Sequence, residues 1–106
     1  MPKYLVHANY VGEGVIGLLK EGGTSRRAAT EKAVKSLGGT LEAFYFAFGE
    51  TDAYVIAEVP DNASMAAIAL IVSASGAVKV KTTVLLTPEE IDMAVKKTPS
   101  YRPPGQ

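Results

Sequence analysis

Two apolar runs that flank a short polar segment, between Phe44 and Val59, constrain the fold more than any other feature of the sequence. Each run alternates larger and smaller residues with the period of two that a β-strand requires. The polar segment Gly49–Asp52 has the composition of a turn. The pattern therefore predicts a β-hairpin with strands over residues 40–48 and 53–59. Pairing large with small side chains favours one register, with Phe48 opposite Ala53, Phe46 opposite Val55 and Phe44 opposite Ala57.

Helical patterns precede the hairpin. Apolar residues recur at helical spacing over Arg26–Leu37, and Ala29, Ala33, Val34 and Leu37 are the expected inner face. Thr24 or Ser25 is the expected N-cap, and Gly38–Gly39 is the expected C-terminal stop. The segment Val15–Lys20 is predicted to form only a short helical piece, because glycines interrupt it.

Three further elements follow the hairpin. Asp61 or Asn62 is expected to cap a helix over Ala63–Ser75, which is apolar nearly all the way round and should therefore be buried on more than one side. Val78–Leu86 alternates lysine and threonine with valine, which predicts an edge strand protected from further pairing. Thr87–Glu90 has the sequence of a capping box and should begin a short C-terminal helix.

With a first strand over Tyr4–Tyr10, the predicted order is β-α-β-β-α-β. This order predicts an α+β, ferredoxin-like fold with a four-stranded antiparallel sheet, helices on one face, and strands one and three as central neighbours. The length of 106 residues indicates one domain, which we place at residues 1–97. Residues 98–106 contain three prolines and are expected to form an extended tail.

Both faces of the predicted sheet are apolar. The face with Val6, Val55 and the phenylalanines is assigned to the helices. Tyr45, Tyr54 and their neighbours make the opposite face too apolar for contact with water. A second copy is the simplest cover, so we expect a homodimer, or a higher oligomer, in which two sheets face each other. The apolar residues assigned to this opposite face are Leu5, Tyr45, Ala47, Tyr54 and Ile56.

Composition excludes several classes of function. Eleven basic residues balance eleven acidic ones, so no net charge attracts nucleic acid or an anionic membrane. The absence of cysteine excludes disulfides, thiolate catalysis and cysteine-held metal clusters. No phosphate-binding glycine loop is present, and no metal-ligand spacing is evident. The N-terminal segment has no signal-peptide pattern, and Met65–Ala74 is shorter than the roughly 20 residues that span a bilayer. We expect a cytoplasmic protein with no cofactor.

Several motifs resemble the GYD-domain family between Lys3 and about Glu90. They are the opening strand YLVHANY, the element GG-x-L-x-A-F-Y at Gly38–Tyr45, Gly49-x-x-Asp52, the PD dipeptide at Pro60–Asp61 and the ending TTVLLTPEE. The chain departs from the glycine, tyrosine and aspartate of the family name, because Thr51 stands where the tyrosine would lie. The resemblance implies a dimeric α/β-barrel. The wider group includes cofactor-independent monooxygenases, haem enzymes and simple ligand binders, so the resemblance implies no single activity.

His7 is the only histidine and the natural candidate for a general acid or base. The predicted strand order allows it to lie near Tyr54 or Glu58. His7, Asp52 and Tyr54 are therefore the candidate catalytic residues. The alternatives are structural and are favoured: His7 would be a hydrogen-bonded residue of the dimer interface, and Asp52 would bond turn amides.

The candidate ligand-binding residues are Asn9, Arg26, Tyr45 and Glu58. Arg26 stands in the first turn of its predicted helix, where acidic residues are favoured, so a carboxylate or phosphate ligand would explain it; exposed arginines are nevertheless commoner. Two functions remain. The first is a homodimer that binds a small, mostly apolar molecule between sheet and helices or at the dimer seam. The alternative is a cofactor-independent oxygenase or isomerase that uses His7.

Overall fold

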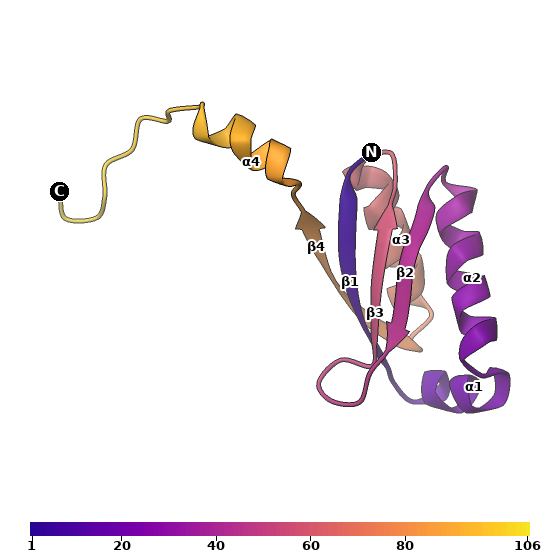
Figure 1. Cartoon of the computed structure of the whole chain (residues 1–106). Coiled ribbons are helices and arrows are strands. Elements are labelled where there is room, and N and C mark those ends of the chain that lie inside the picture. The colour runs from indigo at the N-terminus through magenta and orange to yellow at the C-terminus, as the bar shows by residue number, and fades with distance from the viewer.

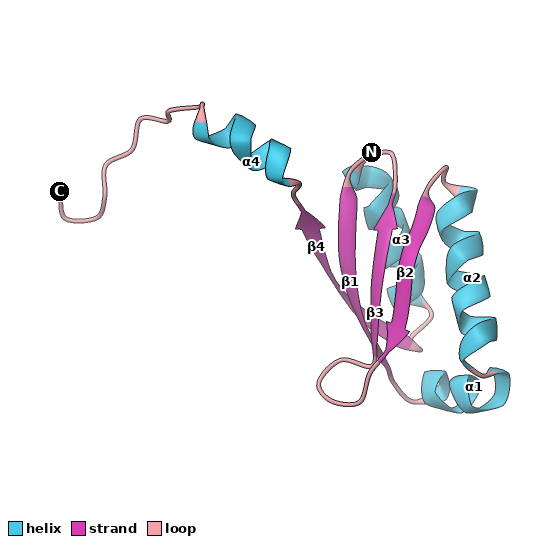
Figure 2. Cartoon of the chain, viewed as in Figure 1, coloured by secondary structure: helices cyan, strands magenta, loops and turns pink.

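Four antiparallel strands form one sheet in the order β2-β3-β1-β4, and two of the four helices cover one of its faces (Figure 1). The computed structural model describes residues 1–106 and confirms the predicted ferredoxin-like order, with β1 and β3 in the centre. Figure 2 shows the same view by element type. The elements are β1 (Lys3–Tyr10), α1 (Glu13–Glu21), α2 (Gly23–Ser36), β2 (Thr40–Phe46), β3 (Ala53–Glu58), α3 (Asn62–Ala74), β4 (Val78–Leu85) and α4 (Pro88–Val95).

The core lies between the sheet and the helices α2 and α3. Tyr4, Val6 and Ala8 of β1 are buried on this side, as the alternation predicted, and Val55 and Ala57 of β3 lie beside them. The hydroxyl of Tyr4 donates a hydrogen bond to the side chain of Asn62 at the start of α3. Ten residues of the chain are buried and all ten are hydrophobic, so this small core contains no charged group.

The predicted register of the hairpin is wrong by two residues. Phe46, rather than Phe48, lies opposite Ala53, and Phe44 lies opposite Val55. Strand β2 therefore ends at Phe46, earlier than predicted, and residues 47–52 form a longer connection. A hydrogen bond from the Ala47 amide to the Asp52 carbonyl (2.8 Å) closes this connection. A shift by two residues preserves the faces of the strands, but it leaves Phe48 fully exposed outside the sheet.

A β-bulge in β2 moves one residue between faces. The pairing with β3 shifts between Leu41 and Ala43, so that Leu41 lies opposite Ala57 on the core face and is buried. Simple alternation along β2 would place Leu41 with Ala43 and Tyr45 on the opposite face. The extra residue at Glu42 changes this, since a bulge reverses the alternation beyond it.

The segment before the hairpin forms two consecutive helices. The prediction of a short piece at Val15–Lys20 underestimates α1, which has nine residues. Thr24 and Ser25 lie inside α2 and do not cap it; the N-cap residue is Gly22, with φ 82° and no side-chain hydrogen bond. This left-handed backbone at Gly22 lets the chain turn and begin α2 directly after α1.

Helix α2 presents a different face to the sheet from the one its apolar pattern predicts. Ala29 and Ala33 are exposed, whereas Val34 is buried. Thr30 and Arg26, one and two turns before Val34, are half-buried on the inner face of the helix. The apolar signal of an alanine-rich helix is weak, because a methyl group gains little from burial.

The end of α2 is a Schellman motif. Gly38, with φ 80°, donates to the Lys35 carbonyl (3.0 Å), and Gly39 donates to the Val34 carbonyl (3.0 Å). The predicted glycine stop is thereby confirmed. Gly39 is also held closely against β3, because a β-carbon built there would overlap the Glu58 carbonyl oxygen.

Helix α3 leaves part of its apolar surface uncovered. The predicted cap at Asp61 is confirmed, and the hydrogen bond from the Ser64 amide (2.8 Å) lowers the pKa of the Asp61 carboxyl. Met65 faces the core and is buried, but Leu70 and Ile71 are 70% and 74% exposed. The expectation that α3 is buried on more than one side is therefore wrong for the single chain, since the sheet covers only one side of the helix.

The C-terminal part projects from the sheet. Helix α4 begins with the predicted capping box of Thr87 and Glu90, and all of its residues are exposed (Figure 1). No other helix or strand packs extensively against it. The radius of gyration, 16.9 Å, is correspondingly larger than the value of about 13 Å expected for a globular domain of this length.

Substitution of Gly39 by alanine tests the contact between α2 and β3. The new methyl group would overlap the Glu58 carbonyl and lie 2.8 Å from Val59, so we expect a loss of about 1–3 kcal/mol in the free energy of unfolding, measured with urea. Gly17→Ala is the matched control, because no atom lies within 4 Å and alanine favours helix. Equal stabilities of the two variants would contradict this packing.

Candidate functional site

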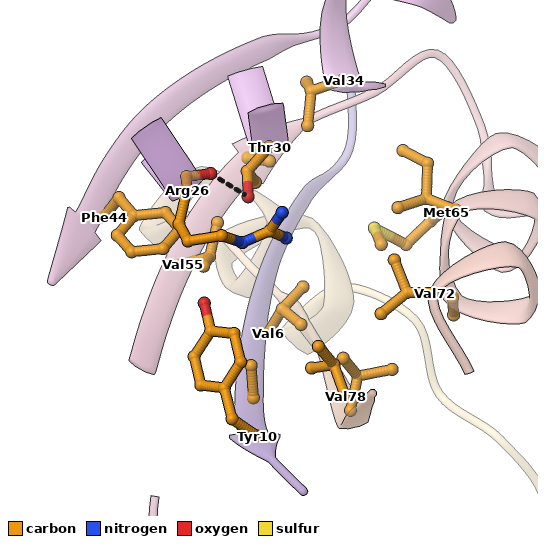
Figure 3. Close-up of a pocket in the computed structure, with 15 residues that line it drawn as sticks. Val6, Tyr10, Arg26, Thr30, Val34, Phe44, Val55, Met65, Val72 and Val78 are labelled. Carbon is orange, nitrogen blue, oxygen red and sulfur yellow. Dashed lines mark hydrogen bonds between the residues drawn. The ribbon is translucent and has the colours of Figure 1, made fainter. Parts of the chain in front are cut away.

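A small apolar cavity lies between the sheet and the helices α2 and α3 (Figure 3). Its volume is about 80 Å³, and its walls come from all four strands and from both helices. Thirteen of the fifteen lining residues are hydrophobic; the other two are Arg26 and Thr30. Sites for small molecules have this character, with mostly apolar walls and a few polar groups that orient the ligand.

Arg26 brings a positive charge to this cavity. Its side chain reaches from α2 into the space above Val6, and the hydroxyl of Tyr10 points toward the same end (Figure 3). Its Nε is buried and has no hydrogen-bond partner. One terminal nitrogen, Nη1, lies 3.8 Å from the carboxylate of Glu21, which is longer than a hydrogen bond. The side-chain hydroxyl of Thr30 donates to the backbone carbonyl of Arg26 (3.0 Å) and so does not satisfy the guanidinium.

His7 lies on the opposite face of the sheet, which no helix covers; we call this face the open face. Its ring meets that of Tyr54 edge-on, with the ring centres 5.0 Å apart. Nδ1 of His7 lies 3.5 Å from the Thr51 hydroxyl. A depression of about 750 Å³ adjoins these groups, and it is lined mainly by polar side chains of β1, the 47–52 connection and β4. His7 and the apolar cavity are therefore separate.

Asp52 fastens the hairpin connection to the end of β1. Its carboxylate accepts a hydrogen bond from the Tyr10 amide (3.0 Å). Its own amide donates to the Asn9 side chain (2.9 Å) and to the Ala8 carbonyl (3.0 Å). These hydrogen bonds connect Asp52 to β1, whereas the sequence predicted bonds from Asp52 to amides of the turn. The carboxylate and the carboxamide of these two candidate residues are thus occupied in joining two backbone segments.

The family model of the GYD domain matches residues 4–95, which is most of the chain. The chain belongs to the GYD domain family. No curated protein and no solved structure matches it. In this GYD domain, Thr51 and Asp52 are next to β1, and Thr51 contributes the hydroxyl beside His7.

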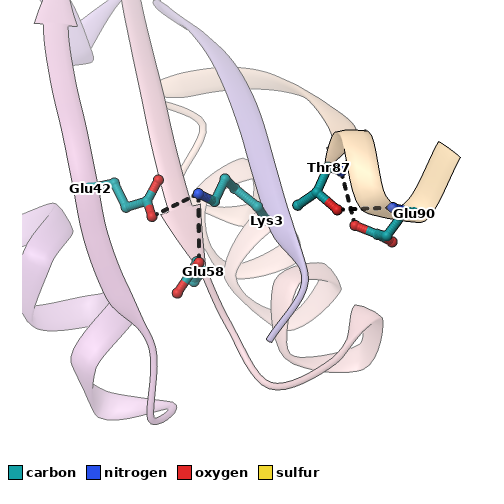
Figure 4. Close-up of polar contacts among 5 residues, drawn as sticks. All are labelled: Lys3, Glu42, Glu58, Thr87 and Glu90. Atoms are coloured by element: carbon teal, nitrogen blue, oxygen red, sulfur yellow. Dashed lines mark hydrogen bonds and ion pairs between the residues drawn. The ribbon is translucent and has the colours of Figure 1, made fainter. Parts of the chain in front are cut away.

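The other candidate residues of the GYD domain lie far apart in the structure. Tyr45 lies opposite Tyr54 on the open face. Glu58 does not lie near His7; it pairs with Lys3 at the other end of β1. Figure 4 shows Lys3 between Glu42 (3.0 Å) and Glu58 (3.7 Å). The hydrogen bond to Glu42, reinforced by the charges of both carboxylates, raises the pKa of Lys3 above its usual value.

The GYD domain contains neither a cluster of metal ligands nor a helix suited to a membrane. No group of three or more histidine, aspartate and glutamate side chains lies close enough together to hold a metal ion. None of its helices has both the length and the apolar composition needed to cross a membrane.

The sequence prediction missed how Arg26 is placed. It named this residue as a possible ligand contact, but it assigned the inner face of α2 to the alanines. The available signal is the spacing of Arg26, Thr30 and Val34, which recur every four residues and share one face of a helix. Tyr10 follows Tyr4 by six residues on β1, so strand alternation also places it on the cavity side of the sheet.

Replacing Asp52 by alanine should weaken the attachment of the hairpin connection. The Tyr10 amide would lose its acceptor, so we expect a loss of about 1 kcal/mol in unfolding free energy and faster hydrogen exchange at that amide. Glu50→Ala is the control, because Glu50 is exposed in the same connection. If both variants matched the unmodified protein, Asp52 would have no such structural role.

Proposed function

We propose that this GYD-domain protein is a homodimer that binds a small, mostly apolar molecule in the apolar cavity. The observation that carries the proposal is the cavity itself, a space of about 80 Å³ with hydrophobic walls and one inward-facing cation. Drug-sized ligands occupy pockets of roughly 300–1,000 Å³. Because one water occupies about 30 Å³ of liquid, the ligand of this cavity is a molecule of only a few non-hydrogen atoms.

Uncovered apolar surface supports the homodimer. On the open face, Tyr45 is 71% and Tyr54 is 39% exposed, and Leu5 and Ile56 lie half-buried beside them. A two-fold axis parallel to this face, in the plane between two facing sheets, would bring the same residues of two copies together, as an isologous interface requires. The exposed side chains of Leu70 and Ile71 on α3 and the projecting α4 offer further surface for contact between copies.

The alternative proposal is an enzyme that uses His7 as a general acid or base. The observation in its favour is that His7, Tyr54 and Thr51 adjoin one another beside the 750 Å³ depression. This depression is open and extends from His7 on the open face, past β4, to Ser73 and Gly76 at the end of α3, so a second copy would have to enclose it for water to be excluded from the reaction. The apolar cavity requires no partner, and we therefore prefer the binding function.

A charge at the centre of the open face tests the homodimer. Tyr54→Glu would bring two like charges together across a two-fold interface, so we expect the dimer to dissociate at least roughly 100-fold more readily, as measured by light scattering. Ala33→Glu is the matched control, because it places the same charge on the outer face of α2. A Tyr54→Glu protein that stays as dimeric as the control would contradict the proposed interface.

Binding of ethanol, a molecule of the size that the cavity holds, tests the cavity. In an amide NMR titration we expect saturable shifts at residues on the cavity walls, including Val6 and Val55. Ala69→Leu, which adds three carbon atoms to the α3 wall, should weaken binding roughly tenfold or more by filling part of the space. Ala66→Leu is the control, because Ala66 is exposed on the same helix. Absence of saturable shifts, or equal affinity in both variants, would contradict a ligand in this cavity.

A further inference from the structure

The guanidinium of Arg26 is the group in this chain whose bonding is left incomplete. Its Nε is the one buried side-chain nitrogen or oxygen that has no hydrogen-bond partner. A buried donor without a partner costs free energy, because the bond that it made to water is not replaced. The side chain as a whole is only 30% exposed and lines the apolar cavity.

Glu21 does not complete the bonding of Arg26. It lies 3.8 Å from Nη1, and it also accepts a hydrogen bond from the Ser25 hydroxyl (3.2 Å) at the exposed junction of α1 and α2. The contact therefore engages one edge of the guanidinium. Arginine has five N–H donors in a planar fork, so the donors that Glu21 does not engage remain for a second acceptor.

The geometry of that fork selects a carboxylate. Two oxygens of a carboxylate match two N–H donors of a guanidinium in parallel hydrogen bonds. A phosphate monoester would bring close to two negative charges against one arginine, since no other basic residue lines the cavity. Apart from Arg26 and Thr30 the walls are hydrophobic, with Val6, Phe44, Val72 and Val80 among them, so the remainder of the ligand is apolar.

We propose that the cavity binds a small aliphatic monocarboxylate, with its carboxylate on Arg26 and its apolar body between the sheet and α3. The inference rests on the proposed ligand-binding function and specifies the ligand class. On the basis of about 30 Å³ for one water, a cavity of about 80 Å³ holds about three non-hydrogen atoms, so acetate is the aliphatic monocarboxylate closest to its size. The Tyr10 hydroxyl, which points toward the same end of the cavity, is a second donor for the carboxylate (Figure 3).

The test compares acetate with ethanol, which has the same carbon chain and no charge. By amide NMR titration at pH 7, we expect the unmodified protein to bind acetate roughly ten- to hundredfold more tightly than the alcohol, the range of a charge-assisted hydrogen bond. Arg26→Gln should remove this preference and leave the affinity for ethanol within about twofold. Retained binding of the alcohol also shows that the variant is folded.

Arg27→Gln is the matched control, because it removes the same charge from the adjacent, exposed position. It should preserve the preference for acetate. Equal affinities for acetate and ethanol in the unmodified protein, or a preference that survives Arg26→Gln, would overturn the assignment to carboxylates while the cavity itself remains a binding site. Failure of both compounds to bind would overturn the proposed function as well.

Discussion

Apolar side chains occupy both faces of the sheet, and the rest of the structure depends on how each face is covered. Helices α2 and α3 cover the face that carries Tyr4, Val6 and Val55. The open face keeps Tyr45 and Tyr54 in contact with solvent in the single chain. Such a surface is costly in water, and the hydrophobic effect favours its burial against a second copy. The small core and the projecting α4 are consistent with a chain that completes its packing by association.

The covered face contains the cavity because the inner side of α2 carries polar as well as apolar side chains. Val34 fills its place in the core, whereas Thr30 and Arg26 on the preceding turns are polar. Thr30 satisfies its hydroxyl on the helix backbone, and the Arg26 guanidinium remains available. Leucine side chains at positions 26 and 30 would fill the cavity. The same helix therefore stabilises the domain at one end and carries the proposed binding group at the other.

The element order and the faces of the strands were predictable, because a shift of the register by two residues leaves each side chain on the same face of the sheet. The register was not, because the length of the 47–52 connection depends on bonds from Asp52 to β1, which no local pattern reveals. The bulge that turns Leu41 inward is also set by tertiary contacts. For the site, residue types identified His7 and Arg26 as candidates, but only the fold separates them onto opposite faces of the sheet.

Sedimentation equilibrium of the unmodified protein at micromolar concentration tests most directly the claim that the sheet requires a second cover. The account predicts a mass twice that of the 11.1 kDa chain, together with protection of the open-face tyrosines from solvent. A stable, folded species with the mass of one chain would contradict it, because Tyr45, Tyr54 and the exposed side of α3 would then remain in water without a partner.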